Sequence, residues 1–324
     1  MASVELTTRT RRVSRTRRGE PAESGGYRPR HRAGRTRERS LGRDAWDELR
    51  RNPLFIVSAA VIVLLVLIAA FPGLFTTLDP TRCDLNFSRQ APSAGAWFGY
   101  DVQGCDIYAR TIYGARASIL VGVLTTTAVV LIGGVIGAVA GFVGGWVDAT
   151  LSRLLEIFFG VPLLLGGILL LAAFPSDTDT PWWLTLTKVV LALSVLGWPA
   201  VARIMRSTVL AVKYADYVVA ARGLGARMGR ILWRHVLPNA VAPVIVYATI
   251  ALGVFIVAEA VLSYLGIGLQ PPIVSWGVDI SNATEYVRQS PHLLIFPGAF
   301  LSLTVLAFIM LGDAVRDALD PKLR

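Results

Sequence analysis

Long apolar runs alternate with short polar segments along this chain. A helix needs about 20 apolar residues to cross the hydrocarbon layer of a membrane. Six runs meet or approach that length: residues 52–78, 117–147, 157–176, 189–202, 236–258 and 293–312. The fourth is the weakest, because it has only 14 residues unless it starts before Lys188 or continues past Ala202. The pattern predicts an all-α membrane protein with six transmembrane helices.

The composition agrees, and the charge is unevenly distributed. The chain is 54% hydrophobic and 17% charged, whereas soluble domains carry about 25% charged residues. Residues 1–53 hold 15 arginines and 7 acidic residues, so most of the net charge of +10 lies there. Residues 1–45 have almost no aliphatic side chains, and such a segment cannot bury enough apolar surface to fold. We expect a disordered Arg-rich tail, followed by a short interfacial helix with Trp46 at headgroup level.

Positive charge also predicts the orientation. Lys and Arg accumulate in cytoplasmic segments. With six spans and a cytoplasmic N-terminus, the inner segments are 1–53, 144–153, 203–240 and 313–324, and they hold 26 of the 32 Lys and Arg. The outer segments hold the remaining 6. Both termini are therefore expected in the cytoplasm. The first apolar run begins near Pro53, too late and too long for a signal peptide, so it is expected to remain as a membrane anchor.

These expectations divide the chain into five parts. They are a disordered tail (1–45), an interfacial segment with the first span (46–78), an extracytoplasmic loop (79–116), a core of five spans (117–312) and a cytoplasmic tail (313–324). The outer loop contains the two cysteines, Cys83 and Cys105. Outside the cytoplasm they could form a disulfide or remain free thiols, and the sequence leaves both alternatives open.

Residues 203–240, between the fourth and fifth spans, carry the most informative pattern. Ala220-Ala221 is followed after three residues by Gly225, and after nine more by His235-Val-Leu-Pro238. Both gaps match the Glu-Ala-Ala loop of the membrane subunits of ATP-binding-cassette importers, which this loop resembles. The chain has Val219 and His235 where that consensus has Glu and Ile. Small residues would let a short helix dock closely in a partner's groove, and Pro238 is expected to end the helix and turn the chain into the fifth span.

Further segments are similar to one subfamily, the dipeptide and oligopeptide permeases, over roughly residues 50–324. The matching segments are 97–106, 113–118, 259–272, 275–277, 296–298 and 311–321. This subfamily usually has Gly-Arg-Asp where the present chain has Gly104-Cys105-Asp106. The resemblance implies the type I importer permease fold with a cytoplasmic coupling helix, in a bacterial inner membrane.

The resemblance also implies the partners and the coupling residues. The partners would be a homologous second permease, two cytoplasmic ATPase subunits and an extracytoplasmic substrate-binding protein. This chain would supply half of the substrate pathway. The residues implied to couple to the ATPase are Ala220, Ala221, Arg222, Gly223, Gly225, Ala226, His235, Leu237 and Pro238.

The sequence predicts no chemistry carried by this chain itself. A phosphate-binding P-loop needs Gly-Lys followed by Ser or Thr, and none of Lys188, Lys213 and Lys322 follows a glycine. ATP and Mg²⁺ are therefore expected on the partner ATPases. The three histidines are far apart and lack metal-ligand spacing, so we expect no metal, no cofactor and no catalytic group.

Two charged features remain. A carboxylate within a span normally faces a cavity or a partner, so Glu259 is a candidate for a structural or a gating role in the pathway, while Glu156 is expected at a cytoplasmic boundary. The Arg-rich tail lacks the aromatic platforms of a nucleic-acid reader. We expect the tail to contact anionic membrane lipids and no nucleic acid.

Other functions are weighed against the peptide importer. An ion-driven secondary transporter would show inverted repeats, and no internal repeat is evident. A membrane enzyme or scaffold would leave the coupling pattern unexplained. The same importer type could instead carry nickel or another small solute, and one permease sequence leaves the substrate open.

Overall fold

The computed structural model describes residues 46–177 and 179–319. The predicted tail at 1–45 and the last five residues lie outside this part. The described residues are helical apart from their connections and contain no β-strand beyond isolated bridges. Five helices are long and apolar enough to cross a membrane: α2 (Pro53–Ala70), α3 (Ile107–Val143), α6 (Trp182–Lys213), α10 (Ala242–Tyr264) and α12 (His292–Leu319).

A sixth span exists if a bent pair of helices is counted as one. The pair consists of α4 (Gly145–Phe159) and α5 (Leu163–Ala173), which meet at 84°. Gly160 ends α4, and Pro162 precedes α5. Proline disfavours helical backbone in the residue before it, so the break lies where the sequence places Pro162. The predicted continuous span at 157–176 is therefore wrong in its first part, because residues 157–159 belong to α4.

Helix α3 begins ten residues earlier than the predicted span at 117–147. The Asp106 side chain accepts a hydrogen bond from the amide of Ala109 (2.8 Å) and caps the helix. Arg110 and Arg116 limit the apolar run in the sequence, but the helix begins before them. One of them, Arg116, donates to the carbonyls of Ala69 (3.0 Å) and Ala70 (3.2 Å) at the end of α2. The predicted outer loop at 79–116 is correspondingly shorter.

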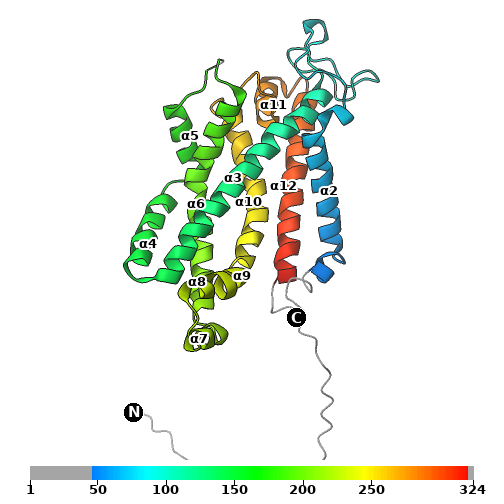
Figure 1. Cartoon of the computed structure of the whole chain (residues 1–324). Coiled ribbons are helices and arrows are strands. Elements are labelled where there is room, and N and C mark those ends of the chain that lie inside the picture. The colour runs from blue at the N-terminus through cyan, green and yellow to red at the C-terminus, as the bar shows by residue number, and fades with distance from the viewer. Residues whose placement is uncertain (1–45, 178, 320–324) are drawn as a thin grey trace, which may run out of the picture. The chain divides into compact units, whose positions relative to one another are not determined.

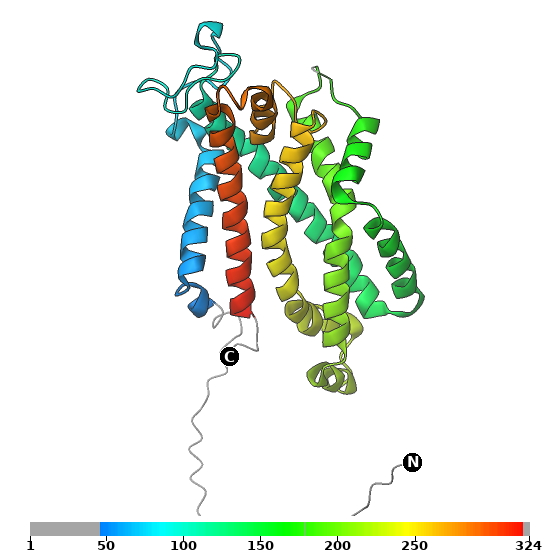
Figure 2. The same cartoon turned by 180° about the vertical axis from the view of Figure 1, so that it is seen from behind.

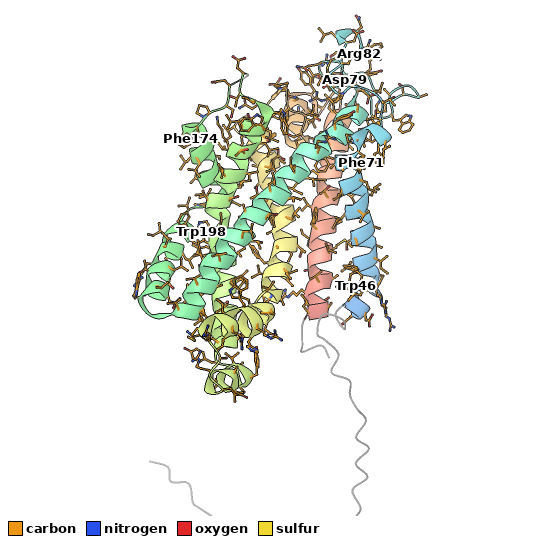
Figure 3. The ribbon with its side chains drawn as sticks, viewed as in Figure 1. Trp46, Phe71, Asp79, Arg82, Phe174 and Trp198 are labelled. Atoms are coloured by element: carbon orange, nitrogen blue, oxygen red, sulfur yellow. A yellow bond between two sulfur atoms is a disulfide. The ribbon has the colours of Figure 1, made fainter. Side chains whose placement is uncertain are left out.

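Helix α2 ends at Ala70, before the predicted limit at residue 78. Phe71 leaves helical geometry (φ −128°), and Pro72 starts a 3₁₀ turn. The 18 residues of α2 rise about 27 Å, close to the thickness of the hydrocarbon layer. Trp46 lies beside the first turn of α2 and Phe71 at its other end (Figure 3). Both side chains are exposed, as expected for aromatic residues at the two membrane interfaces.

Two further spans extend beyond their apolar runs, whereas the predicted span at 236–258 is shifted, because α10 begins at Ala242 and ends at Tyr264. The predicted fourth span at 189–202 becomes α6, which starts before Lys188 and continues through the arginines to Lys213. Helix α12 continues to Leu319, into the predicted tail at 313–324. Charged residues at span ends reach polar surroundings without interrupting the helix, which explains why the apolar runs underestimate its length.

A stripe of glycines brings α3 against α6. Gly133, Gly137 and Gly141 occur one turn apart on α3. A Cβ on Gly133 would lie 2.5 Å from the carbonyl oxygen of Trp198, and one on Gly137 would overlap the backbone of Ala202. The four-residue spacing of these glycines therefore allows the backbones of α3 and α6 to pack closely.

The short elements gather at opposite ends of the bundle (Figures 1 and 2). At one end, called the α7 end, lie α7 (Asp216–Gly223), α8 (Met228–Ile231), a π-helical turn (Leu232–Val236) and α9 (Leu237–Ala240). At the other, the α11 end, lie α11 (Trp276–Ala283), a 3₁₀ turn (Thr284–Tyr286) and residues 71–106.

Candidate coupling surface and pathway residues

The segment between α6 and α10 projects from the α7 end (Figure 1). Three fully buried side chains fix it to the bundle: Val218 in α7, Ile231 in α8 and Val236 in the π turn. All three belong to one hydrophobic cluster that continues into the core. The segment is thus anchored through one apolar face and presents its other face outward.

The first half of the predicted coupling pattern forms α7 and its end. Ala220, Arg222 and Gly223 are exposed, and Ala221 is half-buried. The Gly225 amide donates to the carbonyl of Arg222 (3.0 Å), with Gly225 at φ +79°. That backbone region strains any residue with a Cβ. Backbone conformation rather than lack of space therefore favours glycine at this position, because nothing lies within 4 Å of where its Cβ would be.

The second half of the pattern lies beyond the turn, in the π segment and α9. His235 and Leu237 are half-buried, whereas Pro238 is exposed. The expectation that Pro238 ends a helix is wrong, because Pro238 lies in the first turn of α9. Helical geometry continues without a break from the π turn into α9, where the Leu237 amide donates to the carbonyl of Leu232. The chain turns into α10 after Ala240 instead.

Large apolar side chains are exposed on the outward face, although the sequence pattern predicted small residues there. Leu224 is 89% exposed and Trp233 is 74% exposed. Tyr217, Val219 and Met228 are also exposed on the same segment. An exposed apolar patch next to polar residues marks an interaction site. We call these five side chains the coupling surface. Leu224 directly precedes Gly225 in the sequence, so the spacing pattern already pointed to its position.

Arginines surround the coupling surface. Arg222, Arg227, Arg230 and Arg234 are all exposed. None forms an ion pair with an acidic residue in the part of the chain that the structure describes. Four unpaired positive charges around an apolar patch suit a partner with acidic groups at its rim.

Polar contacts tie the base of this segment to the bundle. Arg206 of α6 forms a two-point ion pair with Asp148 of α4, and its Nη2 atom lies 2.7 Å from Asp148 Oδ2. Lys213, at the end of α6, donates to the carbonyl of Phe142 in α3. A displacement of α7 would therefore be transmitted to α3, α4 and α6 together. Glu156 instead pairs with its helix neighbour Arg153, and both are exposed.

Glu259 of α10 is fully buried toward the α11 end. The Ser263 hydroxyl donates to its Oε1 atom (2.7 Å) and accepts from the amide of Leu269 (2.9 Å). Ser118 of α3 and Ser275, the N-cap of α11, lie near the same carboxyl. The Oε2 atom has no hydrogen-bond partner among the described residues. Glu259 thus lies in a polar junction between three helices, and sequence reasoning found the residue but not these serines.

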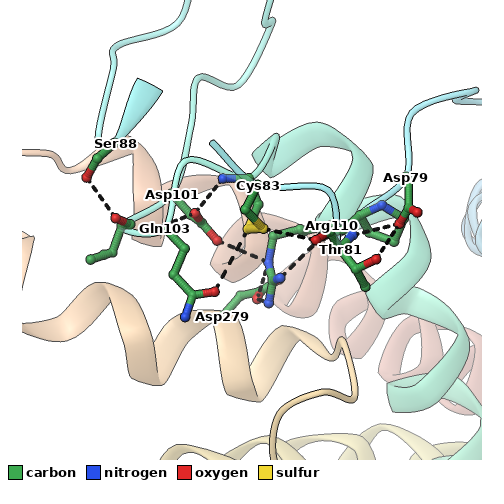
Figure 4. Close-up of a disulfide and its surroundings, with 11 residues drawn as sticks. Asp79, Thr81, Cys83, Ser88, Asp101, Gln103, Arg110 and Asp279 are labelled. Carbon is green, nitrogen blue, oxygen red and sulfur yellow. Dashed lines mark hydrogen bonds and ion pairs between the residues drawn. A yellow bond between two sulfur atoms is a disulfide. The ribbon is translucent and has the colours of Figure 1, made fainter. Parts of the chain in front are cut away.

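Cys83 and Cys105 form a disulfide at the α11 end (Figure 4). The Asp101 carboxylate accepts the amide of Cys105 (2.8 Å) and lies 3.4 Å from the Nε atom of Arg110. Arg110 also pairs with Asp279 of α11 through Nε (2.9 Å) and Nη2 (2.5 Å). The possible disulfide is evident from the sequence, but the pairing of Arg110 with Asp279 is not, because the two residues are 169 positions apart.

Comparison with known proteins identifies the family. The family described as binding-protein-dependent transport system inner membrane component matches residues 133–324, more than half of the chain. The chain belongs to this family. The family described as the N-terminal transmembrane domain of oligopeptide transport permease C matches residues 40–92. The two matches together cover the first helix and the core from the middle of α3 onward.

Relatives of the permease support the same assignment over most of its length. It is 36% identical to a dipeptide transport system permease of Alkalihalophilus pseudofirmus, over 87% of this chain and 90% of the relative. It is 39% identical to an oligopeptide transport system permease of Bacillus subtilis, over 88% and 91%. A crystal structure of an amino acid ABC transporter with histidines shares 20% identity, covers 64% of this chain and 92% of that chain, and has a TM-score of 0.49.

Family membership and the apolar helices together establish the permease as a multi-pass inner-membrane component of a binding-protein-dependent transport system. The predicted all-α fold is confirmed, with five membrane-crossing helices, or six if the bent pair counts as one span. The alternative of an ion-driven secondary transporter does not agree with this membership. No group of three or more His, Cys, Asp or Glu residues is placed to hold a metal ion in the described part of the permease.

Proposed function

We propose that this chain is one of two permease subunits in an ATP-driven importer of dipeptides or oligopeptides. It would form half of the pathway with a homologous permease. Two cytoplasmic ATPase subunits would bind at the α7 end, and an extracytoplasmic binding protein would deliver the peptide at the α11 end. ATP and Mg²⁺ would be held by the ATPase subunits.

The coupling surface is the observation that carries the proposal. A short helix anchored by Val218 exposes Leu224 at its end. The next residue, Gly225, has a positive φ that other residues adopt less easily. The polar links from Arg206 and Lys213 connect this helix to the bundle. A partner that grips α7 could therefore move several spans at once, which is what alternating access by an external motor requires.

Charge supports the orientation. The first residues of α2 and the last residues of α12 both lie at the α7 end (Figures 1 and 2). The exposed arginines of the coupling segment lie at this end, and so do Arg50 and Arg51, which lie just before α2 and are exposed. A cytoplasmic α7 end satisfies the positive-inside bias.

The substrate class rests on the relatives. Those named for dipeptide or oligopeptide transport are 36–39% identical over most of the chain. Others, 34% identical, are named for glutathione transport. Glutathione is itself a tripeptide, so both sets of names favour a peptide substrate over nickel or another non-peptide solute.

Cross-linking tests the motor contact. In Leu224→Cys the introduced thiol is accessible, while the two native cysteines are joined to each other. We expect it to cross-link to an ATPase subunit of the intact complex through a short bifunctional reagent. The matched control is Leu303→Cys on α12, which is 45% exposed on a membrane-spanning helix. A complex in which Leu224→Cys cross-links no ATPase, or no more than Leu303→Cys does, would contradict the proposal.

ATP hydrolysis tests the substrate. The complex would be reconstituted in lipid vesicles with its binding protein, and hydrolysis measured with a dipeptide, a pentapeptide, glutathione or nickel. Stimulation by at least one peptide is the expected result. Stimulation by nickel alone would overturn the peptide assignment and leave the importer assignment standing.

A further inference from the structure

We propose that residues 71–106 (the closed segment, in which the disulfide links Cys83 to Cys105) and α11 form one rigid cap at the α11 end, held together by Arg110 as a positioning residue. No part of the transport cycle assigned above uses Arg110, Asp101 or Asp279. All three are buried or nearly so, although they carry charge. Buried charges are normally paired, and the pairing of these three side chains joins separate elements of the chain.

Arg110 contacts three separate elements from its place on α3 (Figure 4). Its guanidinium binds Asp279 of α11, lies 3.4 Å from Asp101 Oδ2, and donates to the carbonyl of Pro80 (3.4 Å). Pro80 lies three residues before Cys83, and Asp101 lies four residues before Cys105. Arg110 therefore connects the chain near each cysteine with α11.

The disulfide holds Asp101 in the position that Arg110 needs. The Asp101 carboxylate accepts the amides of Gln103 (2.8 Å) and Cys105 (2.8 Å) through one oxygen, which leaves the other facing Arg110. The Asp101 amide donates back to the carbonyl of Cys105 (2.9 Å). Because Cys105 is fully buried and bonded to Cys83, this turn cannot shift unless the disulfide opens or the whole segment moves.

A second set of contacts supports the same grouping. Arg89 of the closed segment lies over the ring of Tyr286, 5.0 Å from its centroid, and donates to the Gln289 side chain (3.4 Å). Phe98 stacks on Phe296 in the first turns of α12, with centroids 3.9 Å apart. These contacts hold the closed segment to the connection that follows α11 and to α12, independently of Arg110.

Helix α11 in turn is packed tightly against the spans. The Trp276 indole N–H donates to the carbonyl of Thr111 in α3 (2.9 Å). A Cβ on Gly277 would lie 2.7 Å from the backbone of Ala260 in α10. A cap that moves as one unit would therefore change the outer ends of α3 and α10 together. This consequence for transport rests on the proposed function, while the cap itself does not.

Hydrogen exchange measures the coupling directly. The complete transport complex in lipid nanodiscs would be compared before and after reduction with dithiothreitol. We expect reduction to raise the exchange rate of the amides in 276–283 on the order of tenfold, although the disulfide itself lies outside α11. Unchanged exchange in 276–283, with the disulfide shown to be reduced, would overturn the proposal.

Two variants test whether Arg110 carries the coupling. Arg110→Met should raise exchange in 276–283 before reduction, and reduction should then add little, as expected for residues that act in one network. Asp101→Asn keeps the acceptor for the two amides but loses the charge, so it should give the same pattern if Arg110→Met fails to fold. Arg116→Met, on the same helix, removes contacts to α2 only and should retain the full effect of reduction. Equal effects of reduction in Asp101→Asn and the unmodified protein would contradict the role of Arg110.

A functional measurement separates the cap from the proposed function. ATP hydrolysis stimulated by the binding protein should fall several-fold on reduction, in the unmodified complex and in Arg116→Met alike. If the unmodified complex shows no stimulation at all, the proposed function fails, whereas the exchange data still decide whether the cap exists.

Discussion

Gly133 of α3 lies against Trp198 of α6 so closely that a Cβ on the glycine would be 2.5 Å from the tryptophan carbonyl oxygen. The next residue, Gly134, faces away from this contact, and its nearest neighbour would be the end of the Met205 side chain at 3.9 Å. Two adjacent glycines on one helix thus have opposite tolerance for a side chain. Backbone cannot move aside as a flexible side chain can, so only Gly133 is fixed by packing.

Gly133→Ala is therefore expected to destabilise the permease by roughly 1–3 kcal/mol, as other overpacked sites do. Gly134→Ala should be neutral or slightly stabilising, because alanine favours helix and meets only ordinary contact. Thermal unfolding of the two purified variants in the same detergent measures the difference. Equal melting temperatures would show that α3 and α6 can separate at no cost at this point.

The conformation of Gly225 makes a second matched pair possible. Gly225 has φ +79°, whereas Gly223 lies within α7, and both positions are open to solvent. Gly225→Ala should cost about 1 kcal/mol and reorient the end of α7. Gly223→Ala should have no such cost.

Coupled ATP hydrolysis is the suitable measurement for this pair. Gly225→Ala should lower the ATP hydrolysis that the binding protein stimulates, with the complex still assembled, and Gly225→Asn should lose less because asparagine tolerates this backbone region. If Gly223→Ala impairs coupling as much as Gly225→Ala does, side-chain size rather than backbone conformation limits the contact.

Apolar pattern and residue spacing locate much of this architecture. The runs identify every membrane-crossing helix, and the spacing from Ala220 to Pro238 identifies the segment that projects at the α7 end. The helix ends are less predictable. Arg110 and Arg116 interrupt the apolar run although they lie inside α3, because their partners on α11 and α2 become neighbours only in the folded chain.

The same limit applies to the candidate sites. Glu259 stands out in the sequence as a carboxyl in an apolar run, yet its neighbours Ser118 and Ser275 come from other helices. Leu224 and Trp233 look like ordinary core residues in the sequence, and only the fold shows that they are exposed. Non-local contacts and exposure depend on how helices pack, which a single sequence does not record.

The ion pair between Arg206 and Asp148 is expected to contribute roughly 0.5–1.5 kcal/mol, because it is two-pointed and only about a quarter exposed. A double-mutant cycle with Arg206→Gln and Asp148→Asn isolates this coupling energy. The pair Arg153–Glu156 is the control, since it lies mostly in solvent. Its coupling should be close to zero, and a larger value there than for Arg206–Asp148 would contradict the structural argument.

Two substitutions of Glu259 distinguish a structural role from a gating role. Glu259→Gln keeps an oxygen that can accept the Ser263 hydroxyl and adds a donor on the side where Oε2 has no described partner. We expect it to retain stability within about 1 kcal/mol and to retain peptide transport. Glu259→Ala removes the acceptor and leaves a cavity, so it should lose roughly 2–4 kcal/mol. Melting temperature and peptide uptake would be measured on the same vesicles for both variants. A Glu259→Gln permease that melts normally but no longer transports would show that the ionisable carboxyl itself takes part in the cycle, and the structural role would then be rejected.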